Sequence, residues 1–183
     1  MQGLTLGILG LGTVGSGVVK ILRQNREVLE RRVGIPLSIA RIAVRDLKAK
    51  RATEVEAELL TTDPWAVVRD PSIDIIVELM GGIEPAKSLI LAAAAQGKPV
   101  VTANKALLAE AWDEVFAAVT RHGVDVGFEA SVGGGIPIIR AIREGFVGNR
   151  IESIYGIVNG TSNYILTRMT DAGEEFHAVL GEA

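Results

Sequence analysis

A sequence of 183 residues, 48% of them hydrophobic and 22% charged, is typical of a globular protein with room for one domain and part of a second. Its net charge of −3 provides no basic surface for nucleic acid or an anionic membrane, and no apolar run approaches the about 20 residues that cross a bilayer. The N-terminus lacks the basic region and apolar core of a signal peptide, so we expect a cytoplasmic protein without nucleic-acid or membrane partners.

Residue types that carry nucleophilic or metal chemistry are scarce. The sequence has no cysteine, so oxidation of an aldehyde through a thioester is not expected. The two histidines, His122 and His177, lie far apart and near no group of acidic residues, so a transition-metal site is not expected either.

Strand and helix patterns alternate along the first 130 residues. Short apolar runs predict strands at 4–9, 38–44, 74–79, 99–102 and 125–129. Apolar periodicity predicts helices at 14–31, 64–69 and 84–96, and a further helix that ends near 122. Because the connections are short, we expect parallel β-α-β units and an α/β fold, a doubly wound parallel sheet of the Rossmann type, over residues 1–130.

The pattern changes in residues 131–183. A glycine-rich loop at 131–137 leads to predicted helices at 138–144 and 161–170, with a predicted strand at 151–158 between them and a helical pattern in the last ten residues. One strand cannot bury a core by itself, so it must pair with a partner chain or with residues beyond this sequence. We therefore expect residues 131–183 to begin an α+β substrate and dimerisation domain that is incomplete here.

The six residues 10–15, GLGTVG, directly follow the first predicted strand and open the first predicted helix. In that context Gly10 permits a tight turn, Gly12 lets the backbone approach a pyrophosphate, and Gly15 lets the helix pack closely on the strand. The helix N-terminus adds free N–H groups and the positive end of the helix dipole. We interpret the segment as a dinucleotide-binding turn; the alternative is a glycine-rich turn without a ligand.

The end of the second predicted strand bears on the choice of cofactor. An acidic residue usually lies there, roughly 20 residues after the glycines, and Asp46 lies further along. Arg45 immediately precedes it, and an arginine at this place can pair with a 2′-phosphate. The sequence therefore favours NADP over NAD, with a solvated basic turn as the alternative for Lys50 and Arg51.

Further candidates lie at the carboxyl ends of other strands, where open α/β sheets bind ligands. Gly81 and Gly82 follow one strand and would let the backbone approach the nicotinamide ribose. Lys105 follows another strand beside a helix start, where a cation is unfavourable for the helix dipole. It could polarise a carbonyl oxygen or shuttle a proton, and the alternative is a surface lysine. Lys98 belongs to the opposite edge and is expected only to aid solubility.

Two polar positions keep two interpretations each. Glu129 is either a ligand for substrate or a cation, or a carboxylate that caps a helix; the glycine-rich loop after it exposes backbone oxygens that a hard cation prefers. Asn159, in the segment Asn159–Thr161, precedes a helix, where capping is the alternative to substrate binding.

Five segments together resemble homoserine dehydrogenase, in the order in which that family carries them. They are residues 10–15 (GLGTVG), 77–82 (VELMGG), 101–105 (VTANK), 129–137 (EASVGGGIP) and 159–165 (NGTSNYI). Many dehydrogenases share the first segment, whereas the last three together are far more specific. The resemblance covers nearly the whole chain.

The resemblance implies nicotinamide-dependent interconversion of L-homoserine and L-aspartate 4-semialdehyde, a step towards threonine, methionine and isoleucine. It also implies a homodimer formed through the second domain, with Lys105 as a catalytic residue. The implied cofactor contacts are Gly10, Gly12, Thr13, Val14, Gly15, Arg45, Gly81, Thr102 and Lys105. The implied substrate contacts are Asn159, Gly160 and Thr161, and the implied sodium ligands are Glu129 and the main chain of Val132, Gly134 and Ile136.

The sequence departs from the family by its length. The family's substrate carboxylates and a second lysine, its proton donor, would lie beyond Ala183, as would the small-ligand-binding regulatory domain of many members. We therefore expect these residues alone to bind cofactor and to catalyse poorly or not at all. Two alternatives remain: a different amino-acid or imine reductase on the same fold, and a dinucleotide-sensing module without turnover, whose binding would not depend on Lys105.

Overall fold

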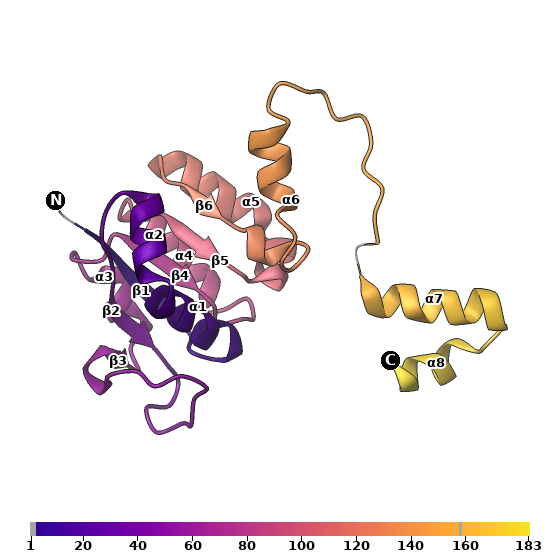
Figure 1. The fold of residues 1–183 in the computed structure, drawn as a ribbon, viewed down its shortest axis with the longest axis horizontal. Helices are drawn as coiled ribbons and strands as arrows, with labels where there is room; N and C mark the ends of the chain where they lie inside the picture. The colour runs from indigo at the N-terminus through magenta and orange to yellow at the C-terminus, as the bar shows by residue number, and fades with distance from the viewer. Residues whose placement is uncertain (1–2, 158) are drawn as a thin grey trace. The chain divides into compact units, whose positions relative to one another are not determined.

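The computed structural model describes residues 3–157 and 159–183, which form two compact units, one up to Arg140 and one from Ala141 to Ala183. The first unit contains a six-stranded sheet in the order β3-β2-β1-β4-β5-β6, and every strand pair in it is parallel. The expected α/β fold with a doubly wound sheet is therefore confirmed (Figure 1).

The strands and helices of the first unit follow the predicted order closely. The strands are β1 (Leu4–Leu9), β2 (Leu37–Ala43), β3 (Leu60–Thr61), β4 (Ile75–Glu78), β5 (Val100–Thr102) and β6 (Val126–Gly127). The helices are α1 (Thr13–Gln24), α2 (Arg26–Val33), α3 (Pro64–Arg69), α4 (Ala86–Ala95), α5 (Lys105–His122) and α6 (Ile138–Arg140), with 3₁₀ turns at Ala57–Leu59 and Glu129–Ser131. Strand β3 is the one element of the sheet that the sequence analysis missed, since two residues are too few to show a pattern.

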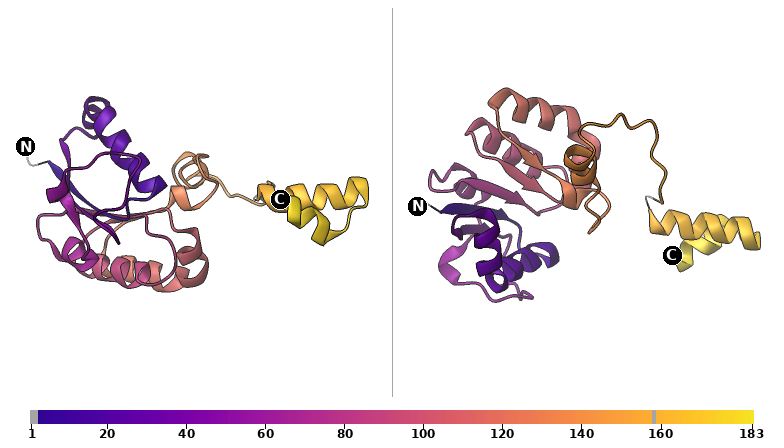
Figure 2. Two further views of the ribbon diagram at one scale, coloured as in Figure 1. Left: turned by 90° about the horizontal axis from the view of Figure 1, so that it is seen from below. Right: turned by 45° about the horizontal axis from the view of Figure 1, so that its top comes forward.

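The sheet is buried on both faces, as the left view of Figure 2 shows: α1 and α2 cover one face, and α3, α4 and α5 cover the other. Successive residues of one strand therefore enter different cores. Ile8 packs with Val19 of α1, whereas Leu9 belongs to the cluster that includes Leu89 and Leu107 of α4 and α5. This explains why the strands are almost uniformly aliphatic rather than alternating.

The single helix predicted over 14–31 is wrong, because the chain forms two helices that meet at Asn25. The backbone of Asn25 is not helical (φ −106°, ψ 18°). Helix α2 is then anchored to the sheet by Glu30, whose carboxylate accepts from the Leu37 N–H at 3.1 Å and from Arg26 at 2.8 Å. The bond from Arg26 and the bond from the Leu37 N–H lower the pKa of Glu30.

The second unit contains a π-helical turn at Ala141–Gly145 and a helical hairpin of α7 (Gly160–Ala172) and α8 (Phe176–Glu182). The strand expected at 151–158 is not formed at residues 151–157, and Val158 lies outside the described residues. A strand requires a hydrogen-bonded neighbour, and the described part of this unit contains no second extended segment to provide one. Ile154, Tyr155 and Ile157 are correspondingly exposed.

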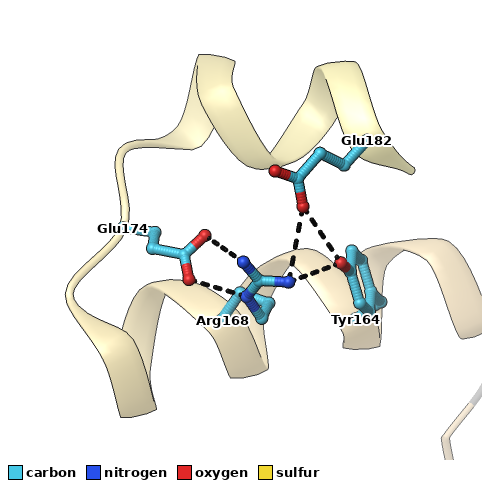
Figure 3. A network of polar contacts seen from close by, with 4 residues as sticks. All are labelled: Tyr164, Arg168, Glu174 and Glu182. Carbon is cyan, nitrogen blue, oxygen red and sulfur yellow. Dashed lines mark hydrogen bonds and ion pairs between the residues drawn. The ribbon is translucent and has the colours of Figure 1, made fainter.

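Arg168 ties the helical hairpin together (Figure 3). Its guanidinium donates two hydrogen bonds to the carboxylate of Glu174, at 2.7 and 2.6 Å, and one to the Tyr164 hydroxyl at 2.7 Å. It also pairs with Glu182 of α8 at 3.4 Å. The hydrogen bonds to Glu174 raise the pKa of Arg168.

Candidate functional site

The loops that follow β1, β2, β4, β5 and β6 meet along one edge of the sheet, because parallel strands end on the same side. Gly10 joins two of these loops. Its N–H donates to the Ala43 carbonyl at 2.9 Å, and a β-carbon at position 10 would come within 2.7 Å of the Leu79 carbonyl oxygen. The turn after β1 therefore lies against the ends of both β2 and β4.

The three glycines of the turn after β1 differ in the space around them. Gly10 has φ +102°, and a β-carbon at Gly15 would lie 2.2 Å from the Gly10 carbonyl oxygen, so neither position accommodates a side chain. A β-carbon at the exposed Gly12 would meet no atom within 4 Å, so this glycine leaves open space rather than packing. Thr13 and Val14 are exposed beside that space.

Helix α1 begins at this turn without a side-chain cap or an acidic residue in its first turn. Helices α2, α4 and α8 likewise lack a side-chain cap, whereas α3, α5 and α7 are capped by Asp63, Asn104 and Asn159, respectively. The first N–H groups of α1 thus lack the side-chain acceptor that α3, α5 and α7 have, and they lie where an anion would supply one.

Arg45 lies at the end of β2 and is exposed. The structure distinguishes it from Arg51 in the same basic segment, because the Arg51 guanidinium donates to the backbone carbonyls of Asp46, Leu47 and Ala49. Arg51 is therefore occupied in holding the loop together. Arg45 remains the predicted partner of a 2′-phosphate.

A buried polar chain links the loops after β4 and β5, and the sequence analysis did not single out its central residue. Glu78 is 0% exposed, accepts from the Met80 N–H at 2.7 Å, and accepts from the Thr102 hydroxyl at 2.6 Å. The Thr102 hydroxyl in turn accepts from the Asn104 N–H at 3.0 Å, and the Asn104 side chain donates to the Gly82 carbonyl at 2.6 Å.

Thr102, predicted to contact the cofactor, thus has its hydroxyl engaged and is 0% exposed. Its carbonyl accepts from the Ser131 hydroxyl at 2.9 Å, which extends the chain to the segment after β6. Both Gly81 and Gly82 adopt positive φ, at +75° and +74°, and both are exposed. The turn they form is therefore a conformation that only glycine adopts without strain.

Lys105 is the first residue of α5 and is exposed. Asn104 fixes the start of α5 just before Lys105. Its side-chain oxygen Oδ1 accepts from the Leu107 N–H at 3.1 Å and so caps the helix. The same side chain binds the Gly82 carbonyl, so the position of Lys105 is coupled to the glycine turn after β4.

Glu129 caps α6 with both carboxylate oxygens, which accept from the N–H groups of Ile139 at 2.9 Å and Arg140 at 2.8 Å. The capping interpretation is therefore confirmed, and cation binding stays a prediction. The donor set offered by this carboxylate and the carbonyls of Val132, Gly134 and Ile136 consists of oxygen alone, which suits a hard cation such as sodium. Among the described residues no cluster of His, Cys, Asp and Glu forms a metal site.

Asn159–Thr161 belong to the second unit, which is described by itself. The Asn159 side chain accepts from the Ser162 N–H at 2.7 Å and caps α7, so the capping interpretation is confirmed for Asn159. Gly160 and Thr161 form the first turn of that helix. Substrate binding by these three residues stays a prediction.

Lys98 corrects one expectation. It lies at the opposite edge of the sheet, as predicted, yet it is only 7% exposed and does not serve solubility. Its ammonium group donates to the carbonyls of Val68 and Asp70 at the end of α3. Burial lowers the pKa of Lys98, and Asp70 and Asp74 partly oppose that change.

Two surface depressions lie away from the glycine turn. One is lined by residues of α4 and α5, including Leu91 and His122, and the other lies beside Lys98 at the amino ends of the strands. Neither includes a predicted site residue. The candidate site lies instead at the carboxyl ends of the strands.

No described helix is long and apolar enough to cross a membrane.

Strand order and glycine turn together define the class of the protein. The order of strands reverses between β1 and β4, which is the point where doubly wound sheets bind dinucleotides, and the glycine turn follows β1 at that point. The first unit is a dinucleotide-binding domain of the Rossmann class.

Comparison with known proteins identifies the family. A family model described as the NAD-binding domain of homoserine dehydrogenase matches residues 10–129, and a second homoserine dehydrogenase model matches residues 137–183. The chain belongs to the homoserine dehydrogenase family. It is 52% identical over 180 residues to homoserine dehydrogenase from Synechocystis, a match that covers 97% of this chain and 41% of that protein.

Solved structures agree with this assignment. A homoserine dehydrogenase from Thiobacillus denitrificans superimposes with a TM-score of 0.87 at 53% identity, covering 100% of this chain and 42% of the other. A hyperthermophilic archaeal homoserine dehydrogenase in complex with NADPH superimposes with a TM-score of 0.79 at 25% identity, covering 100% of this chain and 60% of the other. The chain thus spans about two fifths of the curated relatives that it matches.

Proposed function

We propose that these residues form the cofactor-binding part of an enzyme that interconverts L-homoserine and L-aspartate 4-semialdehyde with NADP. The observation that carries the proposal is the turn at Gly10–Gly15, open at Gly12 and facing an uncapped helix N-terminus. Backbone N–H groups in this arrangement bind a pyrophosphate. The archaeal relative in complex with NADPH supports the choice of cofactor.

The two halves of the sheet would receive different ends of the cofactor. Arg45 at the end of β2 lies in the half that binds the adenosine, where its guanidinium would pair with a 2′-phosphate. The turn at Gly81–Gly82 and the start of α5 lie on the other side of β1, in the half left for the nicotinamide. NADP rather than NAD is therefore the proposed cofactor.

The bound cofactor supplies or accepts the hydride, and the protein contributes position and charge. Lys105 would place its ammonium group near the oxygen of the substrate, where it stabilises negative charge on that oxygen or holds a proton for it. Its location at the end of β5, beside Gly82, supports this role. Glu129 and the carbonyls of Val132, Gly134 and Ile136 would hold a sodium ion in the adjoining loop.

Other parts of the proposal rest on family membership rather than on contacts within this chain. They are the substrate contacts of Asn159, Gly160 and Thr161, a homodimer, a cytoplasmic location, and a place in threonine, methionine and isoleucine synthesis. Analytical ultracentrifugation of the chain tests the dimer directly. If the chain is monomeric, these 183 residues do not form a dimer by themselves.

A chimera tests catalysis. Residues 1–183 would replace the matching segment of the Thiobacillus denitrificans protein, which is 53% identical over this chain. We expect L-homoserine-dependent reduction of NADP, followed by absorbance, and a collapse of turnover in Lys105→Ala. Arg121→Ala, which removes an exposed cation at the opposite end of α5, is the matched control. A folded chimera that binds NADPH but shows no turnover would contradict the assignment of the reaction.

A further inference from the structure

The carboxylate of Glu78 is buried at the end of the central strand β4 and touches no cation. It is 0% exposed, and among the ion pairs of residues 3–157 and 159–183 none includes Glu78. Burial of a carboxylate is costly, and packing a strand does not require one. Its two partners, the Met80 N–H and the Thr102 hydroxyl, therefore indicate what it is for.

Both partners belong to the site rather than to the core. The Met80 N–H lies in the loop that leads to Gly81 and Gly82, and Thr102 ends the strand that leads to Lys105. The Thr102 hydroxyl donates its one hydrogen to Glu78, so its oxygen is left to accept from the Asn104 N–H. All hydrogen bonds of this chain therefore have a fixed direction. The Asn104 side chain then donates to the Gly82 carbonyl, which connects α5 back to the loop after β4.

We propose that Glu78 is a positioning residue for the nicotinamide half of the cofactor, which holds the Gly81–Gly82 turn and the Lys105 end of α5 in one fixed arrangement. The inference rests on the proposed function, since it assigns the cofactor end that this arrangement receives. Glu78 itself lies beneath the surface and acts through Thr102 and Asn104. The Ser131 hydroxyl, bonded to the Thr102 carbonyl, joins the loop after β6 to the same unit.

Two probes separate positioning from general stability. NADPH occupies both halves of the site, whereas adenosine 2′,5′-bisphosphate lacks both the nicotinamide and its ribose and occupies only the half near Arg45. We expect Glu78→Gln to raise the Kd of NADPH about tenfold, because the amide cannot accept from both the Met80 N–H and the Thr102 hydroxyl. The Kd of adenosine 2′,5′-bisphosphate should change about twofold or less, since independent sites do not couple.

Three further variants sharpen the test. Thr102→Val removes the hydroxyl at nearly constant shape and should match Glu78→Gln, whereas Thr102→Ser restores the hydroxyl and much of the affinity. Asn104→Ser retains a helix cap but cannot reach the Gly82 carbonyl, so it cuts the link to the turn alone. Glu30→Gln is the control, because that carboxylate also accepts from a side chain and a backbone N–H but lies at the amino end of β2.

Hydrogen exchange of the chain without nucleotide provides a second measurement. Glu78→Gln should speed exchange at Gly81 and Gly82 and at the first turn of α5 together, although these segments are separate in sequence. Faster exchange confined to residues beside position 78 would overturn the inference. So would equal weakening of both nucleotides in step with thermal stability, or unchanged affinity in every variant. Wild-type chain that binds neither nucleotide would contradict the proposed function instead, and the exchange result would still decide the positioning role.

Discussion

A β-carbon at Gly15 would lie 2.2 Å from the carbonyl oxygen of Gly10, which is closer than any real contact. The entrance to α1 and the end of β1 are therefore in direct backbone contact, and the space between them is closed to any side chain. The turn that would receive a pyrophosphate is held by the same contact.

Gly15→Ala should accordingly destabilise the protein by about 1–3 kcal/mol, because the helix must move away from the strand. Thermal or urea unfolding measures the loss. Gly17→Ala is the matched control on the same helix, since a β-carbon there would meet no atom within 4 Å. It should gain about 0.5–1 kcal/mol from helix propensity. Equal stability of the two variants would show that the contact does not constrain the fold.

Gly12→Ala should separate binding from folding. The position is open, so the fold should lose no more than about 1 kcal/mol, the cost of alanine at a helix N-cap. The added methyl group would occupy the space of the pyrophosphate and weaken NADPH binding about tenfold or more. Fluorescence titration with NADPH and a thermal melt measure the two effects. A variant that binds NADPH normally would place the pyrophosphate elsewhere.

Arg45→Ala should remove the preference for NADP. Loss of charged hydrogen bonds to a 2′-phosphate predicts a Kd for NADPH that rises roughly 10- to 100-fold, with little change for NADH. Calorimetric titration with both nucleotides measures the ratio. Lys50→Ala, in the same basic segment, should leave that ratio unchanged. If instead Lys50 carried the effect, the solvated turn would be the phosphate site and Arg45 would not.

Lys98 should make the free energy of unfolding depend on pH in the alkaline range. Its pKa in the folded state lies below the usual 10.5, chiefly because of burial. Between the folded and unfolded pKa values the unfolded chain binds more protons, so stability from this group rises with pH up to about 10.5. Urea unfolding of wild type and Lys98→Met across that window should show the difference growing with pH. The variant should also lose about 1–3 kcal/mol, since the Val68 and Asp70 carbonyls lose their donor.

The helical hairpin should depend on the fork geometry of Arg168. Arg168→Lys keeps the charge but cannot bind both oxygens of Glu174 and the Tyr164 hydroxyl. Because the group is about a third exposed, the loss should be modest, about 0.2–1 kcal/mol. Hydrogen exchange in α7 and α8 measures it. Arg143→Lys, on the π-helical turn of the same unit, is the control and should leave that exchange unchanged.

The fold was predictable where local pattern and tertiary structure agree. The strands of the sheet are aliphatic because both faces are covered, and short connections leave parallel pairing as the simplest topology. The glycine turn was predictable because each glycine in it has a local reason. Asn25 shows the limit: the apolar pattern continues through it, and the break between α1 and α2 comes from its backbone and from the tie of Glu30 to β2.

The exposed residues of the site could be predicted from the sequence, whereas the buried ones could not. Exposed positions at strand ends, such as Gly81 and Lys105, follow from topology alone. Glu78 does not, because its partner Thr102 is 24 residues away and nothing in a strand sequence marks a carboxylate as buried. The prediction that Lys98 is exposed was wrong for the same reason. Its acceptors are carbonyls about 30 residues earlier, which no sequence pattern displays.

The central position of β1 has a consequence for synthesis on the ribosome. The strand emerges first and can pair with β2, at residues 37–43, soon afterwards, whereas its other neighbour β4, at residues 75–78, and Thr102 and Ser131, which fasten the loops of the site, follow later. One side of the aliphatic first strand is therefore unpaired in the nascent chain until β4 has been translated. Nucleotide cannot assist folding at that stage, because the crevice between the ends of β1 and β4 has not yet formed.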